Sequence, residues 1–324
     1  MGLLDKREYY KPFEYPEVFK YIEKINHSYW LHSEVNFNAD LSGYKKLSDI
    51  EKSIITNTLL AIAQIEVSVK LFWGNLYEMF PKPEINGMGS SFAESEFRHS
   101  EAYSRLLEIL GLEHSFETFL ENAVIRNRFN YLVKSRNKDP QTFAKKIAIF
   151  SLVIENVSLF SQFLIILSFK KYKGLLTNVA NQIQWTSFDE QTHADGGMFL
   201  VNKLFEEYPE IKTEEFIEKI TTLAKEAFKH EQAVLDLIFE KGDLPFLKRE
   251  VIEEFIKDRI NQSFSGIGFE KPYKDLNKKL LEEVEWFDNY VFGNVKKDFF
   301  SGRPTEYTVG NIVIDENSLF EDEE

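Results

Sequence analysis

The chain has 324 residues, of which 43% are hydrophobic, and this length suffices for one large hydrophobic core. Its formal net charge of -14 argues against nucleic acid as a partner, because the phosphate backbone attracts basic surfaces. The chain contains no cysteine, which excludes disulfides and thiolate metal sites.

The sequence predicts an all-α protein. Thirty phenylalanines against 15 glycines and 9 prolines are typical of long helices with few turns. Ser48 and Glu51 form a capping-box pattern at the start of one long helix, and Gly111 marks the end of the next. A strand-like alternation is essentially limited to the weak pattern YTVGNIVI near the end of the chain. In chain order, helical periodicity covers about 15–27, 47–80, 87–110, 115–135, 140–171, 175–207, 212–239, 247–263 and 274–293.

The two ends of the chain differ in character. The first residues, MGLLDKREYY, lack the apolar segment of a signal peptide, so we expect a cytoplasmic protein. From about residue 300 the chain is acidic, with Leu319 and Phe320 as its strong apolar residues near the end. We therefore predict a folded domain over 1–299 and a flexible tail over 300–324.

One segment, 147–169, is long and apolar enough for a membrane span. Glu155, Asn156 and Gln162 would then lie in lipid, where polar groups are costly. We identify no second segment of this kind, and we expect a buried helix of a protein that does not enter the membrane.

Two carboxylates stand alone in apolar helices. Glu155 lies in SLVIENVSLFSQFLIILSF, and no Lys or Arg occurs between Lys146 and Lys170. Glu66 shares the stretch between Lys52 and Glu78 with a single other charged residue, Lys70. A buried, unpaired carboxylate must be neutralised, paired or bound to a metal.

Two Glu-x-x-His motifs complete a constellation. Glu96 and His99 lie in AESEFRHSEAY, and Glu190 and His193 lie in SFDEQTHADGG. Residues at i and i+3 share one face of a helix, so each pair can converge on one ion, although a single motif of this kind is often only a solvated helix face.

Together, the six residues Glu66, Glu96, His99, Glu155, Glu190 and His193 resemble the ligand set of ferritin-like dinuclear carboxylate proteins. Two divalent ions would neutralise the four carboxylates, and oxygen-rich ligation with imidazole suits iron or manganese. The alternative for Glu155 is a protonated core carboxylate that hydrogen-bonds a polar neighbour.

The whole chain resembles the small, radical-generating subunit of class I ribonucleotide reductase. The resemblance rests on the order of its motifs: a tryptophan in YWLHSEVNF, a lone carboxylate, E-x-x-H-x-x-x-Y, a lone Glu, D-E-x-x-H, and a tail after DFFSG with one tyrosine. It implies a ferritin-like helical bundle with additional helices, a dinuclear metal centre that stores a one-electron oxidant, and a homodimer. It also implies a large subunit that binds ribonucleotides, converts them to deoxyribonucleotides and carries the reducing cysteines.

The resemblance further implies roles for individual residues. The six residues named above would be the metal ligands, and Tyr103 falls at the position of the radical tyrosine. Trp30 and Asp189 fall on the route of radical transfer, and Tyr307 at the tail tyrosine that passes the oxidising equivalent to the large subunit. Glu34 matches a glutamate at the junction between the subunits. The tail with Leu319 and Phe320 would dock on the large subunit. The competing interpretation of each aromatic residue is an ordinary core or tail residue.

Glu66 and Lys70 point to one branch of the family. Many members have Asp where this chain has Glu66, and Lys70 lies one helical turn further along the same face. The pair resembles the manganese-using branch, called class Id, in which an oxidised dimanganese centre acts directly and the tyrosine is retained without carrying the radical. We thus favour dimanganese over diiron or a mixed manganese–iron centre, with superoxide or dioxygen as the oxidant. The alternative for Lys70 is a helix-face ion pair with Glu66.

Three other functions remain open on the sequence alone. A ferritin-like oxidase or oxygenase would act on its own substrate, and an iron-storage protein would use the same fold. A metal-free helical scaffold is the third. Trp30, Asp189 and the tyrosine in the tail argue against the oxidase, and the tail and the length of the chain argue against storage.

Overall fold

The computed structural model describes residues 2–132, 134 and 137–298, except for the side chains of residues 68–70 and 294–298. These residues are mostly helical, and apart from an isolated antiparallel bridge between Leu244 and Leu247 they contain no strand. The all-α prediction is confirmed. The α-helices are α1 Phe19–His27, α2 Leu41–Lys45, α3 Asp49–Gly74, α4 Leu76–Met79, α5 Pro83–Leu110, α6 Glu113–Glu121, α7 Ala123–Asn127, α8 Pro140–Ile149, α9 Leu159–Lys173, α10 Thr177–Glu207, α11 Glu214–Ile238, α12 Arg249–Gly266, α13 Lys278–Glu282 and α14 Trp286–Asp298. Short 3-10 helices cover Pro16–Val18, His32–Glu34, Phe37–Asp40 and Pro209–Ile211, and a π-helical segment, η4, covers Phe150–Ser158.

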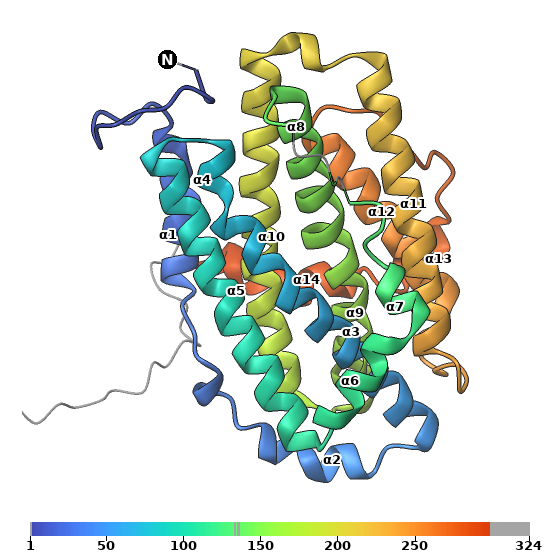
Figure 1. Cartoon of the computed structure of the whole chain (residues 1–324). Helices are drawn as coiled ribbons and strands as arrows, with labels where there is room; N and C mark the ends of the chain where they lie inside the picture. Colours follow the sequence, from blue (N-terminus) through green and yellow to red (C-terminus); the bar gives the residue numbers. More distant parts are fainter. Residues whose placement is uncertain (1, 133, 135–136, 299–324) are drawn as a thin grey trace, which may run out of the picture. The chain divides into compact units, whose positions relative to one another are not determined.

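Four long helical runs form the central bundle: α3, α5, the continuous run α8–η4–α9, and α10 (Figure 1). Helix α3 packs along α5, and α10 packs along the run α8–η4–α9. A short loop joins α9 to α10, so these two helices are antiparallel, and α3 also packs on α9. The apolar faces of the four runs meet in a shared interior, which is the ferritin-like arrangement that the sequence predicts.

Helix α3 begins as predicted and ends earlier. The Ser48 hydroxyl accepts from the backbone N–H of Glu51, and the Glu51 carboxylate accepts from the backbone N–H of Ser48, so the capping box is confirmed. The predicted helix 47–80 is interrupted at Asn75, which separates α3 from the short α4. The predicted helix 115–135 is likewise divided, because Asn122 is extended and caps α7.

Helix α5 begins four residues earlier than predicted. Pro83 occupies its first turn, where no hydrogen bond from the missing N–H is required. The Glu84 carboxylate pairs with Arg7 and accepts from the backbone N–H groups of Glu14 and Tyr15, which fixes the N-terminal segment to the start of this helix. At its other end Gly111 adopts the left-handed conformation, with φ of 69°, as the sequence predicts.

The predicted helix 140–171 is not a regular α-helix. Its middle, Phe150–Ser158, is π-helical, and all nine of its residues are buried. Such π-helical insertions often lie at functional sites because they change the direction of a side chain without ending the helix. Glu155 lies in this segment.

Two helices are apolar and long enough to cross a membrane by length and composition: Asp49–Gly74 and Pro140–Lys173. The sequence indicated a single segment of this kind, 147–169, which lies in the second helix. The expectation that no second segment exists was wrong. The most apolar window of Pro140–Lys173 is 100% buried inside the fold, and that of Asp49–Gly74 is 67% buried. Both values are typical of the core helices of a globular protein.

The chain divides into two compact units, Met1–Glu285 and Trp286–Glu324. The metal-ligand candidates all belong to the first unit. The predicted tail, with Tyr307, Leu319 and Phe320, lies outside the described residues, so the division into 1–299 and 300–324 stays a prediction.

Two glycines of α5 offer a test of the close contact between α3 and α5. A Cβ at Gly89 would lie 2.7 Å from the backbone carbonyl of Trp73, whereas one at Gly87 would lie 3.6 Å from the flexible Ile22 side chain. Gly89→Ala should therefore destabilise the fold by about 1–3 kcal/mol, because the backbone must move. Gly87→Ala should be neutral or stabilise it by up to about 1 kcal/mol through helix propensity. Urea unfolding measures both variants, and equal effects would contradict this close approach.

Candidate metal centre

The six predicted ligands meet in one cluster. Their ligand atoms form two groups, each with all atoms within 4.8 Å of one another. One group consists of Glu66, Glu96, His99 and Glu190, and the other of Glu96, Glu155, Glu190 and His193. Because Glu96 and Glu190 belong to both groups, the arrangement is that of two adjacent ion sites with two shared carboxylates.

Each element of the bundle contributes ligands at a fixed position. Glu66 comes from α3 and Glu155 from η4, while α5 and α10 each contribute a Glu-x-x-His pair on one helix face. The Nδ1 atom of His99 lies 2.9 Å from Glu190 Oε1, and the Nδ1 atom of His193 lies 2.8 Å from Glu96 Oε1. Each imidazole therefore directs Nδ1 at a carboxylate of the opposite helix, which brings α5 and α10 together at the centre.

Burial decides the protonation of the metal-free cluster. All six side chains are 0% exposed. Burial raises the pKa of Glu66 to about 8 and that of Glu155 well above its ordinary value. Burial alone would lower the pKa values of both histidines, but the surrounding carboxylates outweigh it and raise them well above 6.5. Burial is likewise outweighed at Glu190, whose pKa is lowered by contacts with Glu155 and the two imidazoles.

The ligand atoms fit a pair of divalent cations. Both carboxylate oxygens of Glu66 and of Glu96, one oxygen each of Glu155 and Glu190, and Nδ1 of His99 have no hydrogen-bond partner outside the cluster within the described chain. Buried polar atoms of native proteins are almost always satisfied. Two divalent ions would coordinate these atoms and cancel the charge of four carboxylates, so the residues present suit a dinuclear centre.

The Nε2 atom of each imidazole, on the ring edge away from the cluster, also has a polar partner. Nε2 of His193 lies 2.8 Å from the Ser95 hydroxyl, and Nε2 of His99 lies 3.1 Å from Asp189 Oδ2. Such contacts fix the ring orientation of a metal-binding histidine. Asp189 is the residue that the sequence singled out for this position. Ser95 was not predicted, because a serine one residue before Glu96 carries no distinctive signal.

Asp189 also joins the centre to Trp30. The Trp30 indole N–H donates to the same Asp189 oxygen at 3.0 Å, and the Ser28 hydroxyl donates to the other oxygen at 2.9 Å. The rings of Trp30 and His99 are stacked with 5.6 Å between their centroids. All three side chains of the series His99, Asp189 and Trp30 are fully buried, so the series connects the ligand cluster with the segment before α2 through direct contacts.

The comparison with protein families decides the identity. The family model for the small chain of ribonucleotide reductase matches residues 7–279. The chain belongs to this family. It is the small subunit of a ribonucleoside-diphosphate reductase, and its metal site is of the dinuclear kind.

Relatives with this name match most of the chain. The probable ribonucleoside-diphosphate reductase small subunit of Invertebrate iridescent virus 6 is 32% identical over 262 residues, which cover 74% of this chain and 72% of the relative. That of Invertebrate iridescent virus 3 is 26% identical over 333 residues, covering 97% of this chain and 87% of the relative. These names favour the reductase over the oxidase and storage alternatives.

Solved structures confirm the fold. The ribonucleotide reductase R2 subunit from Clostridium botulinum has a TM-score of 0.79 at 18% identity and covers 90% of this chain and 94% of its own. The dimanganese(II)-NrdF of Streptococcus sanguinis has a TM-score of 0.74 at 17% identity, with 87% and 100% covered. An R2-like ligand-binding oxidase with a Mn/Fe cofactor has a TM-score of 0.68 at 18% identity, with 79% and 95% covered. At these identities the likeness concerns the fold alone.

Trp73, which the sequence did not single out, hydrogen-bonds Glu155 in this reductase subunit. The indole N–H of Trp73, fully buried on α3, donates to Glu155 Oε1 at 2.8 Å. Trp73 packs edge-on against Phe92 and Phe150, so its ring has little freedom. Its place seven residues after Glu66, on the same helix face, was the signal that could have indicated a role at the centre.

Helix α12 supports the π-helical segment that carries Glu155. Arg259 donates to the backbone carbonyl of Asn156 at 2.8 Å, and the Ser263 hydroxyl donates to the carbonyl of Leu152 at 2.9 Å. The Arg259 guanidinium also stacks over Phe160, 3.8 Å from the ring centroid. Side chains of α12 thereby bond to carbonyl groups of η4, which stabilises the irregular backbone beside the candidate ligand Glu155.

The remaining predicted residues have different placements. Tyr103 is buried beside the centre, and burial followed by the charge of Glu66 raises the pKa of its phenol well above 10. Glu34 is exposed, and its carboxylate accepts from the backbone N–H of Leu31 at 3.0 Å. The side chain of Lys70 and the whole of Tyr307 lie outside the described residues.

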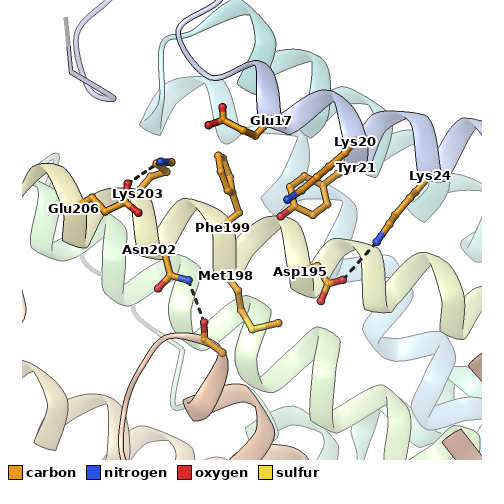
Figure 2. Close-up of a pocket in the computed structure, with 11 residues that line it drawn as sticks. Glu17, Lys20, Tyr21, Lys24, Asp195, Met198, Phe199, Asn202, Lys203 and Glu206 are labelled. Carbon is orange, nitrogen blue, oxygen red and sulfur yellow. Dashed lines mark hydrogen bonds and ion pairs between the residues drawn. The ribbon is translucent and has the colours of Figure 1, made fainter.

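A surface pocket of about 600 Å³ lies between α1, α10 and the end of α12 (Figure 2). Its charged side chains are partly paired, Lys24 with Asp195 at 3.8 Å and Lys203 with Glu206 at 2.7 Å. No metal-ligand candidate lines it. The pocket is therefore separate from the metal centre.

The protonation of the cluster predicts the pH dependence of stability. Because the pKa of Glu66 is raised from 4.5 to about 8, and those of both histidines are raised above 6.5, the folded metal-free protein holds protons that the unfolded chain releases. These protonated groups stabilise the folded state at low pH. This stabilisation is lost as pH rises through the pKa values that the groups have in the folded protein. Chelated protein should therefore have a melting temperature at least roughly 2 °C lower at about pH 8 than at about pH 5.5. Metal-loaded protein, in which the ligands are deprotonated at both pH values, is the control. Equal melting temperatures of the chelated protein would contradict the protonated cluster.

Proposed function

We propose that Glu66, Glu96, His99, Glu155, Glu190 and His193 are the metal ligands of this reductase subunit, and that Asp189, Trp30 and Tyr307 carry the oxidising equivalent to the large subunit. When bound, the dinuclear centre supplies a one-electron oxidant. The observation that carries the proposal is Asp189, whose single oxygen contacts both a ligand imidazole and the Trp30 indole. An oxidase acting on its own substrate would not require this connection.

The roles of the residues follow from their contacts. Asp189 accepts from the indole N–H of Trp30, so it can hold the indole proton when the ring gives up an electron toward the centre. Ser28 and Arg98 keep the carboxylate in place, at 2.9 Å and 3.8 Å. Burial excludes water from the whole series, which prevents the oxidised ring from reacting with solvent. The electron that refills Trp30 would come from Tyr307 at the subunit interface.

Glu155→Ala tests the ligand set. Removing this carboxylate deprives one of the two ion sites of a ligand, so at least one metal per chain should be lost while the helices persist. Metal content per chain and circular dichroism measure the two effects. Glu254→Ala is the matched control, because Glu254 is a largely buried glutamate on α12 whose contacts are Lys257 and the backbone N–H of Asn277. Full loading of both sites in Glu155→Ala would exclude Glu155 as a ligand.

Trp30→Phe and Tyr307→Phe test the route. Phenylalanine keeps the shape of the ring but lacks the readily oxidised indole or phenol, so each variant should lose nucleotide reduction with the large subunit by at least about 100-fold, or roughly 2.7 kcal/mol. The oxidised centre should still form, which its absorption spectrum reports. Trp185→Phe is the control, since Trp185 lies beside Trp30 but outside the proposed route. Near-normal turnover of either variant would remove that residue from the route.

We further propose a dimanganese centre that is itself the oxidant, activated by superoxide or dioxygen. Four full carboxylates, two imidazoles and no cysteine suit manganese as well as iron, and Glu66 has a longer reach than the Asp found in many family members. Lys70, one turn after Glu66 in α3, could donate to an approaching anion. Diiron and mixed manganese–iron are the alternatives.

Two variants separate the metal-only mechanism from one that uses a tyrosyl radical. With manganese loaded, Tyr103→Phe should keep most of its nucleotide reduction, because the phenol is not oxidised. Lys70→Met should be activated poorly by superoxide, because the donor to the anion is lost. Electron paramagnetic resonance of protein isolated without added metal identifies the centre. A tyrosyl signal that disappears together with activity in Tyr103→Phe would restore Tyr103 as the radical carrier. Normal activation of Lys70→Met would return Lys70 to the role of a helix-face ion-pair partner of Glu66.

The assembly follows from the family. We propose that the subunit forms a homodimer in the cytoplasm and docks on the large subunit through its acidic tail, with Leu319 and Phe320 as apolar anchors. The acidic residues of the tail would steer the encounter electrostatically. Glu34 is exposed and lies four residues after Trp30, and we propose that it lies at the junction between the subunits.

A further inference from the structure

Arg98, a buried arginine on α5, contacts both Trp30 and Asp189. Only 3% of its surface is exposed. Its Nη1 group donates to the backbone carbonyl of Trp30 at 3.1 Å and lies 3.8 Å from Asp189 Oδ2. The same Asp189 oxygen accepts from the Trp30 indole N–H at 3.0 Å. The guanidinium therefore lies beside the pair of residues that the proposed route uses.

The guanidinium also lies over the Trp30 ring. Its Cζ atom is 5.7 Å from the centroid of the Trp30 ring and 4.5 Å from that of the Tyr29 ring. A cation at such distances is attracted to the electron-rich face of an intact aromatic ring. It repels the positive charge that the ring acquires when an electron leaves. Arg98 therefore opposes the oxidation of Trp30.

Two carboxylates flank Arg98, and neither removes this effect. Glu94 accepts from Nε of Arg98 through both oxygens, at 3.0 and 3.1 Å, but its side chain is 46% exposed, so water screens its charge. Asp189 is fully buried against the indole of Trp30, and by itself its negative charge would favour oxidation of the ring. Arg98 offsets this charge at the oxygen that contacts the indole.

We propose that Arg98 is a positioning residue whose fixed positive charge, held against Trp30 and Asp189, raises the potential at which Trp30 is oxidised. The inference rests on the proposed function. There, Trp30 gives up one electron, which reduces the oxidised metal centre by one electron, and the indole proton passes to Asp189. An easily oxidised Trp30 would discharge the stored oxidant when no large subunit is bound, and Arg98 protects the oxidant from this loss.

Photochemical oxidation of the full-length protein without metal tests the inference apart from the metal centre. A ruthenium(III) polypyridyl complex generated by a laser flash is the oxidant. The absorbance of the tryptophyl radical, after subtraction of the signal from Trp30→Phe, reports the oxidation of Trp30.

Two variants of Arg98 separate its charge from its hydrogen bond. Arg98→Gln removes the charge but keeps a donor for the Trp30 carbonyl, so Trp30 should be oxidised at least about fivefold faster. Arg98→Lys keeps the charge and should resemble the unaltered protein. An unchanged rate in Arg98→Gln, or equal acceleration in both variants, would overturn the inference.

Glu94→Gln has an expected effect of the opposite direction. It removes a negative charge next to the guanidinium but keeps an oxygen that accepts from Nε of Arg98, so Trp30 should be oxidised more slowly. Because Glu94 is exposed, this variant decides the question if Arg98→Gln does not fold, and an unchanged or faster rate contradicts the inference. Arg105→Gln is the control, since Arg105 lies on the same helix but pairs with Glu108 at the surface.

The persistence of the oxidised centre provides a measurement in the metal-loaded protein. Without the large subunit, its absorption should decay at least about fivefold faster in Arg98→Gln than in the unaltered protein. Combining Arg98→Gln with Trp30→Phe should restore the slow decay, and fast decay in the double variant would contradict the inference. Failure of the proposed function gives a different result: near-normal turnover of Trp30→Phe removes the route but leaves the photochemical effect of Arg98 on Trp30 unchanged.

Discussion

Four carboxylates buried in one bundle interior are the constraint on which the rest of this protein depends. Glu66, Glu96, Glu155 and Glu190 are all fully buried, and most of their oxygens have no hydrogen-bond partner outside the cluster in the described chain. Without metal the cluster holds protons instead, as the raised pKa values of Glu66 and Glu155 indicate. Metal ions and protons thus compete for the same buried site, and folding, metal binding and pH are linked through it.

The same contacts that orient the ligands connect the centre to the rest of the molecule. Asp189 fixes the His99 ring and also accepts from Trp30, so the group that positions a ligand is the first contact on the proposed route. On the other side of the centre, the Ser95 hydroxyl contacts His193 Nε2 and donates to the backbone carbonyl of Phe92. The two imidazoles therefore have different partners at Nε2, although both come from Glu-x-x-His motifs.

The π-helical segment and its supports show how precisely Glu155 is placed. Trp73 from α3 donates to its carboxylate, while Arg259 and Ser263 from α12 bind the carbonyls of the surrounding backbone. Gly89 permits this arrangement, because a side chain there would meet the carbonyl of Trp73 itself. The position of this candidate ligand therefore depends on three helices, and a change far from the cluster can disturb it.

The sequence by itself predicted the helical fold and the six ligand candidates, and its resemblance to a known family singled out Asp189 and Trp30. Lone carboxylates in apolar helices and Glu-x-x-His pairs are local signals, since helical periodicity alone places their side chains on one face. Capping residues such as Ser48 and the glycine at 111 are local in the same sense. The tertiary structure decided what depends on contacts between helices: the π-helical geometry at Glu155, the indole of Trp73 beside it, and Ser95 behind His193. It also placed Arg98 against Trp30, because only the tertiary fold brings the segment before α2 into contact with α5.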